Sequence, residues 1–225
     1  MKKKIIGILV CMLLISAILP ITGSVFAGSE EDPEINDEEQ EDWDICGPFI
    51  SNPYLFKIFS LLGVFDIESF DVIDIVSAWF YECSDNPDYL YTAVKVEDLI
   101  FINQRTIYSV HWTHNGKNYG VGSHTHSDGQ QISCFGGEDR TRNLHEAECV
   151  YDLENNIITF IINKEFVGDP QPGELLTDTW AWTALRFTFE PLTWLFLGEL
   201  AKDYAPGVDE ETHEPEYGRE YIIKY

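Results

Sequence analysis

Basic residues are scarce in this sequence. Lysine and arginine together number 14, against 39 aspartate and glutamate residues, and the formal net charge at pH 7 is -25. Nucleic acids and anionic membranes attract proteins mainly through lysine and arginine, so this balance argues against both classes of partner. The acidic surface fits solubility in salty surroundings or loose binding of cations.

The short motifs of common enzyme classes are also absent. The sequence has no Gly-x-Ser-x-Gly elbow, no Walker loop, no His-Glu-x-x-His helix and no dinucleotide fingerprint. Serine-nucleophile chemistry therefore has no support, and 39 acids make any particular carboxylate pair uninformative. We expect a protein with no catalytic residues.

Long apolar runs are absent except at the N-terminus. Three lysines follow Met1, an apolar run covers residues 5–19, and a boundary of small residues ends at Ala27. This order is typical of a secretory signal peptide, which we predict for residues 1–27. No later run is long enough to span a bilayer. We therefore expect a protein that is secreted or associated with the cell surface, and that is not an integral membrane protein after signal cleavage.

Four cysteines remain once the predicted signal peptide, with Cys11, is removed. An even number of cysteines in an oxidising compartment indicates disulfide bonds, and three pairings are open. We favour Cys134 with Cys149, which fall on neighbouring predicted strands, and Cys46 with Cys83, which would tie the N-terminal segment to the domain. No two of them have the Cys-x-x-Cys spacing of zinc sites, so a metal centre made of cysteines is disfavoured.

The remaining chain divides into two parts by composition. Residues 28–44 hold ten acids and one aromatic residue, too little apolar surface to fold, and predict a disordered acidic spacer. Residues 45–225 are about one domain in length and rich enough in apolar residues to bury a core.

The strongest local signal lies in residues 108–126, where Asn115-Gly116 separates two alternating runs. This dipeptide favours a type I′ turn, whose two-residue loop fixes the register of a β-hairpin. One face of the hairpin is apolar and should be buried, while the other is polar and carries three of the six histidines. The predicted pairs are His114 with Lys117, Trp112 with Tyr119, Val110 with Val121 and Tyr108 with Ser123, and the predicted buried face is Tyr108, Val110, Trp112, Tyr119 and Val121.

Further segments rich in β-branched and aromatic residues follow at short spacing along the chain. Together with the hairpin they predict an all-β fold, an antiparallel, jelly-roll-like β-sandwich of about eight or nine strands. One or two short helices are expected, over Pro53 to Leu62 and over Pro191 to Lys202. The other predicted strands lie within residues 71–82, 89–99, 131–135, 146–151, 156–163, 177–189 and 218–225.

His124 and His126 form a candidate metal site. Residues at i and i+2 of a strand point the same way and lie about 6 to 7 Å apart, so both imidazoles could bind one zinc or copper ion. His111 shares this face but lies opposite Gly120, roughly 13 Å along the strand. The alternative is a polar, solvated sheet face without a metal. The other ligands would have to come from His145, Asp128, Glu138 or Asp139.

Trp180 and Trp182 form a second candidate site. They flank Ala181 on one predicted strand and point to the same side, with Arg186 further along it. Aromatic rings beside polar groups can hold sugars, and packing in the core is the alternative.

Several segments carry a family resemblance: DIVSAWFYE, YLYTAVKVEDL, YSVHWTHNGKNYGVG, WAWTALRF and the closing APG and GREY. Over residues 71–225 the chain resembles secreted archaeal and bacterial β-sandwich domains, related to accessory domains of extracellular subtilisin-like proteases. The opening strands are similar to DOMON-like carbohydrate-binding domains. The resemblance implies the fold and an extracellular location, and it leaves the ligand open.

The expected function is a secreted, non-catalytic binding or accessory module without a cofactor, whose partner is a glycan or an extracellular protein. The alternative is an extracellular protein that binds zinc or copper through His124 and His126.

Overall fold

The computed structural model describes residues 32–37, 44–45, 71–99, 105–125, 132–139, 141, 143–186, 199–209, 212 and 214–225. The predicted signal peptide and the helix predicted over residues 53–62 lie outside these ranges. Within them, no helix has the length and apolar character needed to cross a membrane.

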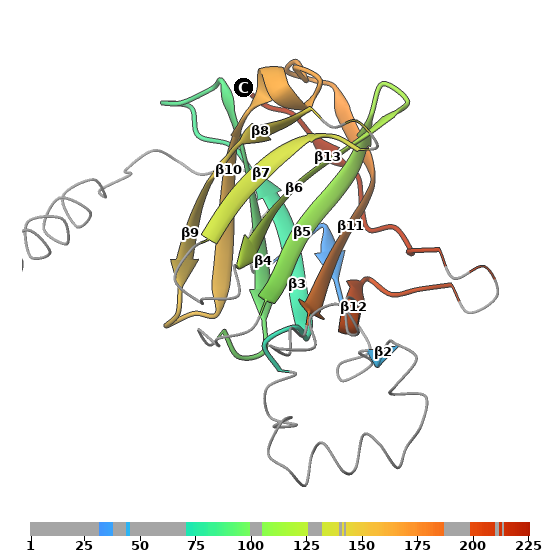
Figure 1. The fold of residues 1–225 in the computed structure, drawn as a ribbon. Coiled ribbons are helices and arrows are strands. Elements are labelled where there is room, and N and C mark those ends of the chain that lie inside the picture. The colour runs from blue at the N-terminus through green and yellow to red at the C-terminus, as the bar shows by residue number, and fades with distance from the viewer. Residues whose placement is uncertain are drawn as a thin grey trace, which may run out of the picture.

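Two antiparallel sheets pack face to face, which confirms the predicted all-β sandwich (Figure 1). The smaller sheet has five strands, which lie side by side in the order β1-β3-β4-β10-β9. The larger sheet has eight strands. Seven of them lie in the order β2-β12-β11-β5-β6-β7-β8, and the eighth, β13, pairs with β11. The strands of the smaller sheet are β1 (Ile35–Asn36), β3 (Ile75–Tyr81), β4 (Tyr89–Val96), β10 (Ile157–Asn163) and β9 (Glu148–Asp152). Those of the larger sheet are β2 (Asp44–Ile45), β12 (Glu199–Ala205), β11 (Leu175–Arg186), β5 (Arg105–His114), β6 (Lys117–Thr125), β7 (Ile132–Glu138), β8 (Leu144–Glu146) and β13 (Tyr221–Ile222).

The hairpin at Asn115-Gly116 has the predicted geometry. Both residues have positive φ angles, 50° and 73°, as a type I′ turn requires. All four predicted pairs between β5 and β6 are present. The five side chains predicted to be buried are at most 6% exposed, and they pack in the common core of the two sheets. Aromatic rings meet there, because Phe80 of β3 packs edge-on against Trp112 at a centroid distance of 5.6 Å.

The helix predicted over Pro191 to Lys202 is wrong at its C-terminal end. Residues 199–205 form β12, which pairs with β11 in the register Ala181 to Ala205. Pairing with a long neighbouring strand overrides the local signals for a helix, as tertiary context often does. Residues 187–198 lie outside the described ranges. Among the described residues, the helical element is one short 3₁₀ helix, Lys164–Val167.

The disordered spacer predicted for residues 28–44 is corrected at residues 32–37. Ile35 is fully buried and pairs with Ala78 of β3, so β1 extends the edge of the smaller sheet. Glu34 accepts a hydrogen bond from the backbone N–H of Phe80 at 3.0 Å, and burial raises the pKa of its carboxyl. Arg219 binds the same segment, through its backbone N–H to the Glu34 carbonyl at 2.7 Å. Burial of Ile35, pairing with β3 and the hydrogen bonds of Glu34 hold this acidic segment against the sheet.

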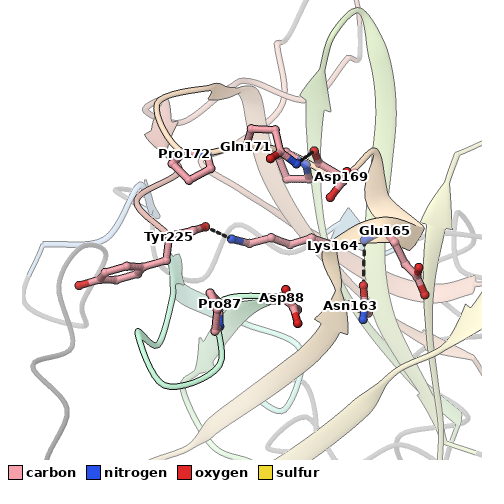
Figure 2. A pocket seen from close by; sticks show the side chains of 10 residues that line it. Pro87, Asp88, Asn163, Lys164, Glu165, Asp169, Gln171, Pro172 and Tyr225 are labelled. Atoms are coloured by element: carbon pink, nitrogen blue, oxygen red, sulfur yellow. Dashed lines mark hydrogen bonds between the residues drawn. The ribbon is translucent and has the colours of Figure 1, made fainter.

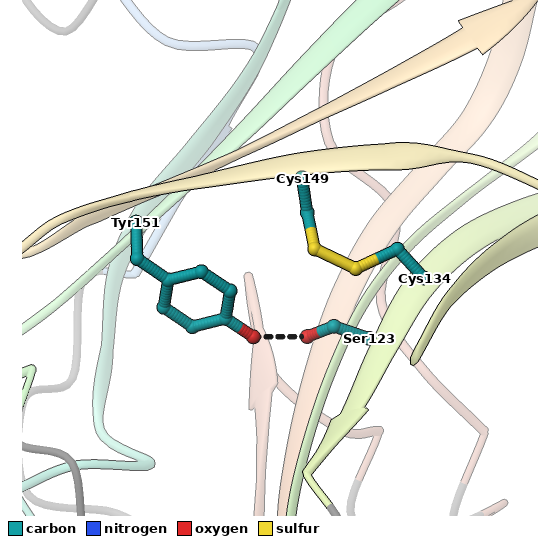
Figure 3. The surroundings of a disulfide bond; sticks show 4 residues. All are labelled: Ser123, Cys134, Cys149 and Tyr151. Carbon is teal, nitrogen blue, oxygen red and sulfur yellow. Dashed lines mark hydrogen bonds between the residues drawn. A yellow bond between two sulfur atoms is a disulfide. The ribbon is translucent and has the colours of Figure 1, made fainter. Parts of the chain in front are cut away.

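A disulfide bond joins Cys134 of β7 to Cys149 of β9, the first of the two predicted pairs (Figure 3). It links the two sheets, with Cα atoms 6.1 Å apart, inside the usual range for a disulfide. Beside it, Tyr151 donates a hydrogen bond to Ser123 at 2.8 Å. Cys83 has a free thiol in the turn after β3, and Cys46 lies outside the described ranges. The second predicted pair is therefore not formed among the described residues.

The anchoring role of β1 predicts a stability effect. Replacing Ile35 with alanine should lower the free energy of unfolding by about 2–5 kcal/mol, because it leaves a cavity in the core. Replacing its neighbour Asn36, whose side chain is exposed, should change it by less than about 0.5 kcal/mol. Urea unfolding of the two variants checks this, and equal stability would place residues 32–37 outside the cooperative core.

Candidate functional site

The outer face of the larger sheet carries the side chains that point away from the core. Strand alternation places Ser109 and His111 of β5 on this face, opposite the buried Val110 and Trp112. Register then adds residues from the neighbouring strands. Trp180 and Trp182 of β11 pair with His111 and Ser109, Gly120 and Gly122 of β6 pair with the same two residues, and Tyr204 of β12 pairs with Trp182.

Trp180, Trp182 and Tyr204 form an aromatic platform on this face. Tyr204 stacks with Trp180 at a centroid distance of 6.0 Å and with Trp182 at 6.4 Å, and all three residues are half-buried. The imidazole of His111 stacks on Trp180 at 4.3 Å with an interplanar angle of 14°. The ammonium of Lys202 lies 4.7 Å from the centre of the Tyr204 ring, a cation–π geometry.

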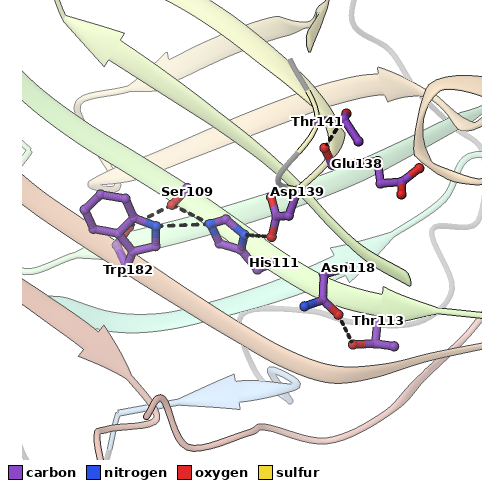
Figure 4. A network of polar contacts seen from close by, with 8 residues as sticks. All are labelled: Ser109, His111, Thr113, Asn118, Glu138, Asp139, Thr141 and Trp182. Carbon is purple, nitrogen blue, oxygen red and sulfur yellow. Dashed lines mark hydrogen bonds and ion pairs between the residues drawn. The ribbon is translucent and has the colours of Figure 1, made fainter. Parts of the chain in front are cut away.

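His111 connects this platform to Asp139 (Figure 4). Its Nδ1 lies 3.0 Å from Asp139 Oδ2, and its Nε2 lies 3.0 Å from both Trp182 Nε1 and Ser109 Oγ. An indole N–H can only donate, so Nε2 must be the unprotonated acceptor. The proton of the neutral imidazole is therefore on Nδ1, which donates to the carboxylate of Asp139. This bonding fixes the tautomer of His111 and the orientation of the Trp182 ring.

Ser109, His111 and Asp139 have the connectivity of a hydrolytic triad, but the surroundings differ from one. Ser109 is only 7% exposed, and its hydroxyl also lies 3.4 Å from the Trp182 carbonyl oxygen. The Nε2 lone pair, which would have to take a proton from a nucleophile, already accepts the indole N–H. The arrangement therefore holds Trp182 and presents no accessible nucleophile at Ser109.

Gly120 makes room for this arrangement. A Cβ atom at Gly120 would lie 2.6 Å from His111 Nδ1, because the imidazole crosses over the glycine to reach Asp139. A Cβ atom at Gly122 would lie 2.6 Å from the carbonyl oxygen of Tyr108. The close approach that these two glycines indicate is thus made by β5 itself.

Polar groups line the end of the site next to the hairpin turn. Asp139 is held by its backbone N–H, which donates to the Asn118 carbonyl at 2.8 Å. Lys117 forms an ion pair with Glu138 at 3.0 Å, and the hydrogen bond to that carboxylate raises the pKa of Lys117. Thr113 donates to the Asn118 side chain at 3.0 Å. Hydrogen-bond donors and acceptors therefore lie at the end of the outer face next to the hairpin turn.

The predicted metal pair is described only in part. His124 lies on β6, half-buried and opposite Ile107 and Ser133, while His126 lies outside the described ranges. The pair stays a prediction. Among the described residues, the ligand atoms of Asp37, Asp74 and Asp203 lie within 4.8 Å of one another, and this buried group contains neither histidine.

A cavity of about 510 Å³ lies at another end of the sandwich, between the 83–88 turn, the 3₁₀ helix and Tyr225 (Figure 2). Lys164 extends along it, but its ammonium is bound by the carboxylate of the buried Glu82 and by the Tyr225 carbonyl. The Glu82 carboxylate also accepts from the Tyr221 hydroxyl at 3.2 Å. The Lys164 ammonium and the Glu82 carboxylate therefore hold the C-terminal segment in place.

Sequence reasoning found the two tryptophans and their shared face, and it missed the contacts that organise them. It placed His111 on the correct face but did not connect it to Trp182 or Asp139. The hairpin turn predicts which residues of β6 pair with β5. No local signal in the sequence predicts how β11 pairs with the other side of β5. Tyr204 was missed because it follows a segment predicted to be helical.

Comparisons with protein-family models, with curated proteins and with solved structures found no match to this chain. The class that the fold defines is an all-β, two-sheet sandwich.

Replacing Gly120 with alanine tests the construction of the site. The added methyl group should push the imidazole away from Asp139 and Trp182 and lower the free energy of unfolding by about 1–3 kcal/mol, the usual cost of overpacking. Asn118→Ala, an exposed position on the same strand, should cost less than about 0.5 kcal/mol. Urea unfolding measures the change in the free energy of unfolding, and the indole N–H resonance of Trp182 reports the displacement of the imidazole. A Gly120→Ala protein with both unchanged would contradict the close approach.

Proposed function

We propose that this protein is a secreted, non-catalytic β-sandwich module that binds carbohydrate on the aromatic platform. The observation that carries the proposal is the position of Trp180, Trp182 and Tyr204. Three large rings lie stacked and half-buried on the outer face of a sheet, where a solvated face would normally carry polar side chains.

A sugar ring fits this surface chemically. A pyranose has a face of C–H groups, which can pack on an aromatic ring, and hydroxyl groups around its edge, which need hydrogen-bond partners. The platform supplies the rings, Lys202 beside Tyr204 supplies a donor, and Asp139, which His111 connects to the platform, supplies a carboxylate. Binding sites generally combine apolar lining with a few placed polar groups in this way.

Rigidity supports the same proposal. Trp182 is held by its hydrogen bond to His111, Trp180 by stacking on the same imidazole, and Tyr204 by stacking on both tryptophans. A ring that is already fixed loses little conformational entropy when a ligand packs on it. Surface tryptophans without such contacts would not form an ordered binding surface.

The charge of the chain narrows the ligand class. A formal net charge of -25 repels acidic polysaccharides, so the proposed ligand is a neutral or amino sugar. The predicted signal peptide and the Cys134–Cys149 bond both fit an extracellular site of action. An extracellular protein partner is the competing outcome of the binding test.

A glycan array that includes cellohexaose and chitohexaose tests the proposal. Trp180→Ala and Trp182→Ala should each weaken binding by about tenfold, the equivalent of about 1.4 kcal/mol of lost stacking. Tyr217→Ala removes a ring that is 55% exposed and outside the platform, and it should leave binding unchanged. Circular dichroism of each variant verifies folding. Absence of glycan binding by the wild-type protein, or binding that survives both tryptophan changes, would refute the proposal.

A further inference from the structure

We propose that the preferred ligand of the platform is a cationic amino sugar, an oligosaccharide of the glucosamine type whose free amine pairs with the carboxylate of Asp139. This inference rests on the proposed function of the platform and names the ligand class for the same site. It places N-acetylated sugars, whose nitrogen is an uncharged amide, together with neutral sugars as weaker ligands.

Asp139 carries a negative charge that is not balanced by a neighbouring cation. Its Oδ2 atom accepts the Nδ1–H of His111 at 3.0 Å, and this imidazole is uncharged because its Nε2 atom accepts the indole N–H of Trp182. The adjacent carboxylate, that of Glu138, already forms an ion pair with Lys117 at 3.0 Å. In the part of the chain that the structure describes, no lysine or arginine forms an ion pair with Asp139. A carboxylate in this state favours a ligand group that brings a positive charge.

This carboxylate is fixed in place and still reaches solvent at the edge of the platform. The backbone N–H of Asp139 donates to the Asn118 carbonyl at 2.8 Å, and the side chain is 33% exposed. The Oδ1 atom lies over β6, because a Cβ atom at Gly120 would be 3.3 Å from it. The imidazole that holds Oδ2 stacks on Trp180 at a centroid distance of 4.3 Å. A ligand that packs on the rings can therefore bring an amine to Oδ1 while the imidazole keeps its bond to Oδ2.

Lys202 lies at the opposite end of the platform. Its ammonium is 4.7 Å from the centre of the Tyr204 ring and 3.2 Å from the Tyr204 hydroxyl. The strand that carries both residues, β12, is three strand spacings from β6, roughly 14 Å. Exposed charges at this separation are largely screened, because the Debye length is about 10 Å at 0.1 M salt. Lys202 therefore does not cancel the attraction of Asp139 for an amine, and it offers a donor to sugar hydroxyl groups at its own end.

The charge of the whole chain acts in the same direction. A formal net charge of -25 raises the concentration of a cationic ligand near the protein and speeds its association. This long-range attraction acts on any polycation, wherever it binds. A preference that depends on Asp139 itself is what identifies the site, so the experiment has to separate the two contributions.

Calorimetry at about pH 7 with three hexasaccharides that differ at carbon 2 tests the inference. Cellohexaose carries a hydroxyl group there, chitohexaose an acetamide, and the glucosamine hexamer an amine that is protonated at this pH as an α-amino group is. The wild-type protein should bind the glucosamine hexamer about tenfold more tightly than the other two, as one charge-assisted hydrogen bond provides, and added salt should reduce this ratio. Equal affinities, or a preference for either uncharged hexasaccharide, would overturn the inference while the proposed function stands. Absence of binding to all three would refute both.

Asp139→Asn removes the charge and keeps the hydrogen bond, because the amide oxygen can still accept the Nδ1–H of His111. An unchanged indole N–H resonance of Trp182 verifies that the platform is intact. The tenfold preference for the amine should fall to about one in this variant, and the readout is a ratio of affinities, so a general weakening of binding cancels in it. Glu148→Gln is the matched control, because it removes one exposed carboxylate from β9 of the other sheet, and it should keep the preference. A preference that survives Asp139→Asn, or that Glu148→Gln reduces equally, would show that the overall charge of the chain causes it and would overturn the inference.

Discussion

The two-residue turn at Asn115-Gly116 is the constraint on which the rest of the structure depends. Its positive φ angles allow a loop so short that β5 and β6 can pair in one register only. That register sends Trp112 into the core and His111 to the outer face. A slip of one residue would exchange the two faces of one strand relative to the other, and on β5 this would bury the histidine and expose the tryptophan.

The outer face gains its order from contacts between strands, because single strands there carry few apolar side chains. His111 reaches across Gly120 to Asp139 in one direction and contacts Trp180 and Trp182 in the other. The imidazole thereby joins a carboxylate beside β7 to two indole rings of β11. These polar contacts hold apolar rings in place on the outer face, where packing alone would leave the rings mobile.

The fold and the candidate site were predictable from the sequence to different extents. Alternation and the turn dipeptide are local signals, and they gave the sandwich class, the hairpin register and the common face of Trp180 and Trp182. Ile35 lies in an acidic segment, and its burial depends on the free edge of β3, which has no local signal. Residues 199–202 of the strand that carries Tyr204 were predicted to be helical for the same reason. The contacts of His111 depend on β11, some 70 residues later in the chain, so its neighbours could be found only in the folded protein.

The order of the outer face depends most directly on which ring nitrogen of His111 carries a proton. Long-range proton–nitrogen correlation of the histidine rings at about pH 8, with the His111 signals assigned by their loss in His111→Gln, shows which ring nitrogen carries that proton. We expect the proton on Nδ1 and an unprotonated Nε2 that accepts the indole N–H of Trp182. A proton on Nε2 at this pH would contradict this expectation, because the indole of Trp182 would then have no acceptor on His111.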